Sequence, residues 1–170
     1  MKVPTTPRDH LIANFAALAI VIHVAEAALP TPLPGVKPGL ANVVTILVLM
    51  RYGWNTAAWV SLLRVVAGSL FLGTFMSPTF LMSVCGAASS ILVLRLAMTV
   101  PGLGAVGLSV TAALAHMGGQ FALAYILFVP HPAMFRLLPV LMTAALIFGT
   151  VSGIIAAAVY QRLPQPISLR

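Results

Sequence analysis

The sequence predicts an all-α membrane protein, a single domain over residues 1–170 built as a bundle of about six transmembrane helices. Hydrophobic residues make up 61% of the chain and charged residues 6%, whereas soluble domains are about 45–50% apolar and about 25% charged. Cutting the chain at proline, glycine and charged residues leaves six apolar runs: 11–29, 36–50, 54–73, 78–99, 103–129 and 132–160. Little of the chain remains outside them, so we expect no separate soluble domain.

The first run is expected to stay in the mature protein as a membrane helix. Its second half carries His23 and Glu26, which makes it too polar for the core of a signal peptide, and no small-residue cleavage site follows it. These two side chains are three residues apart, so they share one face of a helix.

A loop rich in proline and glycine follows the first helix. Residues 29–39 hold four prolines and two glycines, which a regular helix cannot accommodate. The apolar stretch after it, Leu40 to Met50, has eleven residues and is too short to cross a bilayer alone. Irregular backbone beside a short apolar segment is typical of a membrane binding site. The alternative is an ordinary tilted helix beginning at Val36.

The four remaining runs are each long enough to cross a membrane, and two of them carry small-residue patterns. Gly86-x-x-x-Ser90 and Gly149-x-x-x-Gly153 place small residues one turn apart, which is typical of faces where helices pack closely. Such faces predict close helix contacts within the bundle.

The distribution of basic residues predicts which side of the membrane each end occupies. With the N-terminus inside, the cytoplasmic segments hold six of them: Lys2, Arg8, Arg51, Arg95, Arg162 and Arg170. The opposite side holds only Lys37 and Arg136. Because cytoplasmic loops are enriched in Lys and Arg, we expect both termini in the cytoplasm.

Polar side chains at membrane depth are the candidates for substrate binding, because each needs a partner or a wet cavity. We expect six of them to form a site that opens on the outer side: Glu26, Lys37, Asn42, Arg64, His116 and Gln120. His116 and Gln120 are four apart and share a helical face. Arg64 lies on the same face as Gly68, where a neighbouring group can approach closely.

Structural roles for the same residues remain open. Arg64 could pair with Glu26 and lock two helices together, and His116 could be a packing histidine. Lys37 could extend to the lipid headgroups. Sequence alone does not separate these roles from ligand contact.

The charge around the expected pocket predicts the sign of its ligand. Three positive side chains, Lys37, Arg64 and Arg136, face the single negative charge of Glu26. A partly desolvated site with excess positive charge is costly unless an anion or an electron-rich group neutralises it. We therefore expect a small polar or anionic solute.

Catalysis by this chain alone is not expected, and neither is a metal or a cofactor. The sequence has no Gly-x-x-x-x-Gly-Lys-Ser/Thr phosphate loop and no His/Cys cluster with zinc-site spacing. Its only acids, Asp9 and Glu26, are too few to build a magnesium-diphosphate site. The single cysteine, Cys85, excludes an internal disulfide. The basic residues are scattered singly, which argues against a nucleic-acid partner.

Two neighbouring stretches resemble a known family. They are Glu26-Ala-Ala-Leu-Pro30 and Leu33-Pro-Gly-Val-Lys-Pro-Gly-Leu-Ala-Asn-Val-Val-Thr45, and Ala-His-x-x-Gly-Gln at 115–120 adds to them. Together they are similar to the Gx transporter family, also described as heptaprenyl diphosphate synthase component I. The resemblance covers roughly residues 10–160.

The resemblance implies a substrate-binding subunit like the S components of energy-coupling-factor transporters, in the cytoplasmic membrane of a bacterium. Such subunits bind a small solute and dock on a transmembrane coupling subunit with ATPases. Ala13-x-x-x-Ala17 in the first helix resembles their docking face, with packing inside the bundle as the alternative. The resemblance also implies a second role, a non-catalytic membrane accessory of a polyprenyl diphosphate synthase. A structural subunit of a membrane redox assembly is a third alternative.

Overall fold

The computed structural model describes residues 5–28 and 39–163, and this part of the chain contains helices with short connections and no strands. It contains six α-helices and one 3-10 helix: α1 (Pro7–Ala28), α2 (Leu40–Tyr52), α3 (Trp54–Phe71), α4 (Pro78–Ala97), α5 (Ala105–Leu127), η1 (Pro132–Arg136) and α6 (Leu138–Arg162). The predicted all-α bundle of six helices is therefore confirmed.

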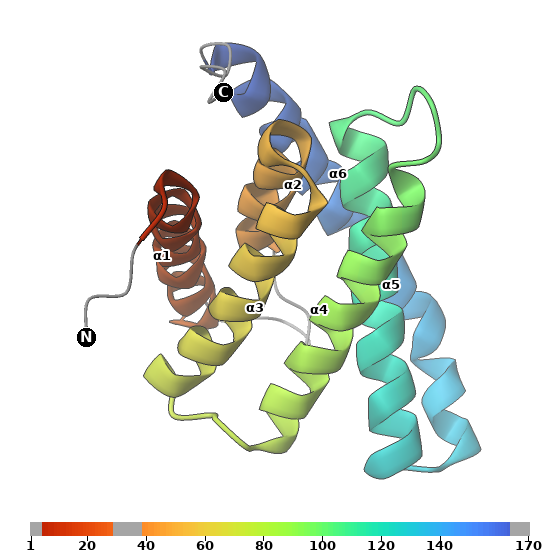
Figure 1. Ribbon diagram of the computed structural model, residues 1–170. Helices are drawn as coiled ribbons and strands as arrows, with labels where there is room; N and C mark the ends of the chain where they lie inside the picture. Colours follow the sequence, from red (N-terminus) through yellow and green to blue (C-terminus); the bar gives the residue numbers. More distant parts are fainter. Residues whose placement is uncertain (1–4, 29–38, 164–170) are drawn as a thin grey trace.

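Successive helices run in alternating directions across the bundle (Figure 1). The starts of α1, α3 and α5 lie with the ends of α2, α4 and α6 at one end of the molecule, which we call the terminal end. The α3–α4 connection and η1 lie at the opposite end. The α4–α5 and α5–α6 pairs make the most extensive contacts, while α1 packs on α2 and α3.

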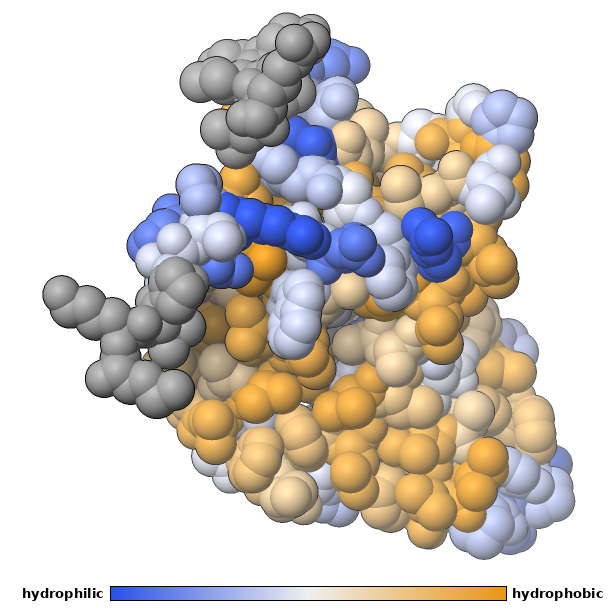
Figure 2. All heavy atoms as spheres, viewed as in Figure 1, coloured by the Kyte–Doolittle hydropathy of each residue, from blue (hydrophilic) through white to orange (hydrophobic). Residues whose placement is uncertain are grey.

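Four of the helices, α1, α4, α5 and α6, are long and apolar enough to cross a membrane. Helix α2 is apolar but has only 13 residues. Helix α3 has 18 residues and carries Asn55, Ser61 and Arg64 among them, which lowers its mean hydropathy. Figure 2 shows apolar side chains over most of the lower half of one face and hydrophilic ones gathered in a band above them. These features identify a membrane protein.

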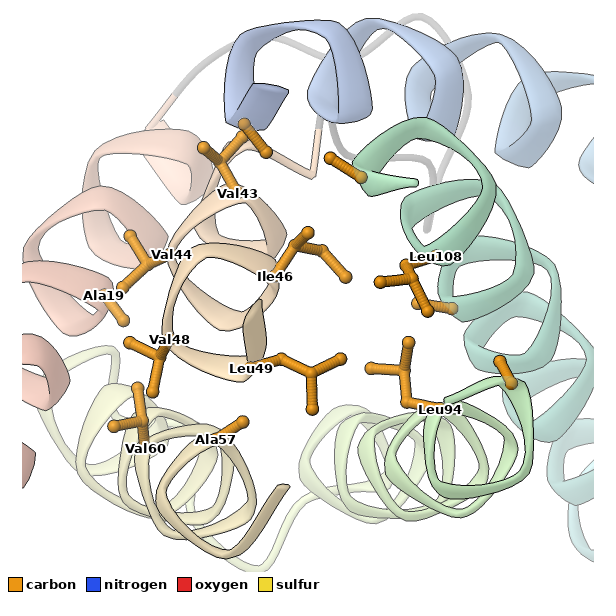
Figure 3. Packing of buried hydrophobic residues seen from close by; sticks show 14 residues of the cluster. Ala19, Val43, Val44, Ile46, Val48, Leu49, Ala57, Val60, Leu94 and Leu108 are labelled. Carbon is orange, nitrogen blue, oxygen red and sulfur yellow. The ribbon is translucent and has the colours of Figure 1, made fainter. Parts of the chain in front are cut away.

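The short helix α2 lies in the centre of the bundle. Its side chains project in several directions, toward α1, α3, α4 and α5 (Figure 3). Ile46 and Val48 have no exposed surface, and Leu49 is almost fully buried. A helix that is apolar on all sides is stable only when other helices surround it, which explains why so short a segment is ordered here.

Two boundaries differ from the sequence-based expectations. Gly39 has a φ of 75°, in the left-handed region, and α2 begins at Leu40, whereas the expected span began at Val36, which lies outside the described residues. The run 132–160, expected as one span, is broken after η1, and α6 begins only at Leu138. Pro139 stands in the first turn of α6, where its missing N–H costs nothing.

Candidate functional site: a cavity between the six helices

A cavity of about 460 Å³ lies inside the bundle, and all six α-helices contribute residues to its wall. The wall uses the last part of α1, the first turn of α2 and the first turns of α4, together with the middle of α3, α5 and α6. The cavity therefore lies between the middle of the bundle and the end opposite the termini.

Five of the six predicted site residues line this cavity: Glu26, Asn42, Arg64, His116 and Gln120. They come from four helices, α1, α2, α3 and α5, and are widely separated in sequence. The sixth, Lys37, lies outside the described residues. The fold thus brings together the polar residues that the sequence places at membrane depth.

Glu26 is buried at the end of α1 and caps the start of α2. Its carboxylate accepts hydrogen bonds from the backbone N–H of Leu40 and from that of Ala41, the latter at 3.4 Å. The first N–H groups of a helix have no partner within the helix, and the helix dipole favours a negative charge there. The Ser152 hydroxyl donates to the Gly39 carbonyl at 3.3 Å and holds the same junction from α6.

Arg64 lies on α3 with only 8% of its surface exposed. Its Nε–H is buried and has no hydrogen-bond partner among the described residues. Within the described residues no ion pair joins it to Glu26, whose carboxylate bonds to the backbone of α2 instead. The pairing that would lock two helices is therefore not present. Glu26 does join two helices, but its partner is the backbone of α2.

Two glycines bring histidine rings against the cavity wall. A Cβ at Gly68 would lie 2.8 Å from the ring of His23, so the close approach expected beside Arg64 is made by this histidine. A Cβ at Gly86 would lie 2.9 Å from the ring of His116 and 2.8 Å from Cγ of Gln120. Gly86, expected only as a helix-packing residue, therefore makes room for two candidate site residues.

The cavity also contains residues that sequence reasoning did not select: His23, Thr79, Met82, Ser83, Met117, Phe148 and Ser152. The spacing of His23 and Glu26 on one helical face was a signal that could have included His23. The serine, threonine and methionine residues carry no such signal, because these types are common throughout membrane helices.

Of the three cations expected around the pocket, the described wall contains Arg64, while Lys37 lies outside the described residues. Arg136 lies in η1 and is exposed, outside the cavity. Among the described lining residues, Arg64 and Glu26 are the charged side chains, with the histidines taken as neutral, and their formal charges cancel. Within the described wall, the group that could attract an anion is Arg64 with its unpartnered Nε–H.

The polar groups in the described wall are mainly hydrogen-bond donors and acceptors. Within residues 5–28 and 39–163, no group of three His, Cys, Asp or Glu side chains is placed to hold a metal ion. Besides His23, Glu26 and Ser152, whose side chains already interact within the protein, the polar groups of the mostly apolar wall are one guanidinium, one imidazole, two amides and two hydroxyls. They can donate hydrogen bonds to a small molecule and fix its orientation.

The two predicted docking residues lie away from the cavity. Ala13 and Ala17 are both exposed on α1, whereas Ala16 and Ala19 are buried against the neighbouring helices. Packing within the bundle therefore uses the second pair and leaves the first pair on the outer face.

Comparison with known proteins identifies a family. Residues 15–159 match the sequence profile of the family described as heptaprenyl diphosphate synthase component I. No curated protein and no solved structure matches the chain.

Proposed function

The chain belongs to the heptaprenyl diphosphate synthase component I family, and we propose that it is a substrate-binding membrane subunit that captures a small polar or anionic solute. The observation that carries this proposal is the cavity of about 460 Å³ with the buried Arg64 in its wall. Small-molecule sites are commonly cavities of about 300–1,000 Å³ whose apolar walls hold a few convergent polar groups.

We infer that the chain binds its solute without transforming it. The one carboxylate in the described wall, Glu26, is bonded to the start of α2. A carboxylate held in this way is not free to coordinate magnesium or to act as a base toward a ligand. The remaining polar groups suit recognition.

Energised uptake would then require partners, as in energy-coupling-factor transporters. The exposed pair Ala13 and Ala17 offers a smooth strip on α1 where a helix of a coupling subunit can approach closely. We propose that a transmembrane coupling subunit with ATPases docks there and supplies the driving force.

In the proposed orientation both termini lie in the cytoplasm of a bacterium and the cavity lies in the outer half of the membrane. The basic residues Arg8, Arg51, Arg95 and Arg162 all lie at the terminal end, where the guanidinium of Arg95 also stacks 5.4 Å from the centre of the Trp54 ring. Basic and aromatic side chains are enriched at such membrane boundaries. A reporter enzyme that works only in the cytoplasm, fused after Arg170, should be active. A reporter that works only outside the cytoplasm should be inactive at the same position, and its activity there would contradict the orientation.

Filling the cavity tests capture directly. The intact chain in lipid nanodiscs is incubated with the small-molecule fraction of a bacterial extract, and native mass spectrometry records any added mass. Ser83→Trp places a large ring in the cavity, whereas Ala88→Trp places the same ring on the exposed face of α4. We expect an added mass in the wild type and in Ala88→Trp and its loss in Ser83→Trp. No added mass in the wild type, or equal binding by Ser83→Trp, would contradict capture.

The family description favours a second candidate, a membrane accessory of a polyprenyl diphosphate synthase. Purification of the tagged chain from gently solubilised membranes separates the two. A soluble prenyl synthase that co-purifies, and whose activity falls when the chain is removed, would support the accessory role. Co-purification of a coupling subunit with ATPases would support capture for transport.

A further inference from the structure

Arg64 is the cavity-lining residue with a buried N–H donor that no described residue accepts. Its guanidinium keeps a positive charge at any physiological pH and carries five N–H donors and no acceptor. Only 8% of the surface of Arg64 is exposed, and its Nε–H has no partner among the described residues. A buried donor without an acceptor is costly, so this position favours a ligand that brings an acceptor to it.

The nearest negative charge is already engaged elsewhere. Glu26 accepts hydrogen bonds from the N–H groups of Leu40 and Ala41, and the helix dipole at the start of α2 further balances its charge. The start of α2 is therefore closed to a ligand anion by a side chain of the protein itself. Arg64 is left as the described anion-binding group of the cavity.

We propose that the captured solute is a small monocarboxylic acid whose carboxylate binds Arg64 and whose apolar body packs on the wall formed by Met82, Met117 and Phe148. This inference rests on the proposed capture function and specifies the substrate class of the same cavity. It also assigns the role of primary ligand contact to Arg64 rather than to Glu26.

A carboxylate fits Arg64 better than a phosphate for two reasons. A guanidinium donates two parallel hydrogen bonds to the two oxygens of a planar carboxylate. A phosphate monoester carries about −1.5 to −2 charges at neutral pH, and Arg64 is the one permanent cation among the described lining residues, with Glu26 contributing an opposite charge. A single negative charge therefore leaves less uncompensated charge in the cavity than a double one.

The rest of the wall predicts the body of the ligand. Apolar side chains from α3, α4, α5 and α6 line most of the remaining surface: Val65, Met82, Ala112, Ala113, Met117, Ala145 and Phe148. Methionine side chains are flexible and adapt to irregular apolar shapes. His116 and Gln120 can each bond to one polar substituent on that body.

The test uses the intact chain, expressed in bacteria and extracted directly into nanodiscs with native lipid. Denaturation releases bound small molecules, accurate mass gives their elemental composition, and methyl esterification counts their carboxylates. Arg64→Gln removes the charge in the cavity. Arg136→Gln makes the same change at an exposed residue outside it, and Ser83→Trp supplies a cavity-filled baseline even if Arg64→Gln does not fold.

We expect an acid with one carboxylate that is retained by the wild type and by Arg136→Gln. It should fall to the Ser83→Trp baseline, or by about tenfold or more, in Arg64→Gln because a charge-assisted hydrogen-bond pair is lost. An enriched molecule that contains phosphorus or lacks a carboxylate would overturn the carboxylate inference and leave capture intact. So would an acid equally abundant in a folded Arg64→Gln. If nothing distinguishes the wild type from Ser83→Trp, both the inference and capture fail.

Discussion

Two pairs of helical glycines in this molecule face different kinds of neighbour. Gly149 and Gly153 on α6 abut α5 itself: a Cβ at Gly153 would lie 2.6 Å from the backbone Cα of Val106. Gly68 and Gly86 instead abut the side chains of His23, His116 and Gln120 at the cavity wall. The first pair sets the distance between two helices, and the second pair makes room for functional side chains.

The difference shows how one bundle can have closely packed helices and also an internal cavity. Helix α5 carries His116 and Gln120 on the face toward α4 and receives Gly149 and Gly153 on the face toward α6. Backbone cannot move aside without separating the helices, whereas an imidazole can turn about its side-chain bonds. Replacing Gly149 or Gly153 should therefore mainly lower stability, whereas replacing Gly68 or Gly86 should mainly weaken solute binding.

The largest loss of stability is expected for Gly153→Ala. The added methyl group meets backbone of α5 at 2.6 Å, so the helices must separate, and overpacking of this kind costs about 1–3 kcal/mol of unfolding free energy. Thermal unfolding in nanodiscs measures the change. Ala158→Ser, at an exposed position of the same helix, should stay within about 0.5 kcal/mol. An unchanged melting temperature in Gly153→Ala would show that the contact is not rigid.

Gly86→Ala should cost less stability and more binding. The new methyl group meets His116 and Gln120, which can rotate away, so we expect a loss of about 1 kcal/mol together with clear loss of the retained solute. A double-mutant cycle with His116→Ala should show coupling for Gly86→Ala and additivity for Gly153→Ala, because only the first pair is in contact. Equal coupling in both cycles would remove the distinction between the two glycine pairs.

Glu26 shares one feature with each glycine pair, because its side chain lines the cavity and it also contacts the backbone of a neighbouring helix. Glu26→Gln keeps an acceptor for the start of α2 but loses its charge, so the unfolding free energy should fall by about 0.5 kcal/mol, at the low end for a helix cap. Combining it with Arg64→Met should give additive changes, as expected for side chains that are not paired. Recovery of stability in the double variant would instead indicate that the two charges balance each other.

The smallest effect on stability is expected on the outer face of α1. Ala13→Leu combined with Ala17→Leu adds bulk at exposed positions, so the melting temperature and solute retention should stay unchanged. Co-purification of a coupling subunit should be lost, because close helix approach requires small residues. Ala16→Leu, at a buried position of the same helix, is the contrasting variant and should destabilise the chain alone. A coupling subunit still bound to the double variant would contradict docking at this strip.

Much of the architecture and most of the candidate site followed from sequence. Long apolar runs with few charges are typical of membrane-spanning helices, and a charged or polar side chain inside a membrane needs a partner or a wet cavity. This reasoning is why Glu26, Arg64 and His116 were selected and why the fold brings them to one cavity. It could not place the break before α6, because Pro132 and Pro139 are each compatible with the first turn of a helix and do not state where one helix ends.

What the sequence determined by itself was the membrane class, the number of helices and which residues share a helical face, since hydrophobicity and the 3.6-residue period are local properties. Only the tertiary structure decided which faces meet. It gave Glu26 the start of α2 as its partner rather than Arg64, and it set His23 against Gly68 and His116 against Gly86. The physical reason is that small-residue faces make several helix pairings nearly equivalent, and only the simultaneous packing of all six helices selects one of them.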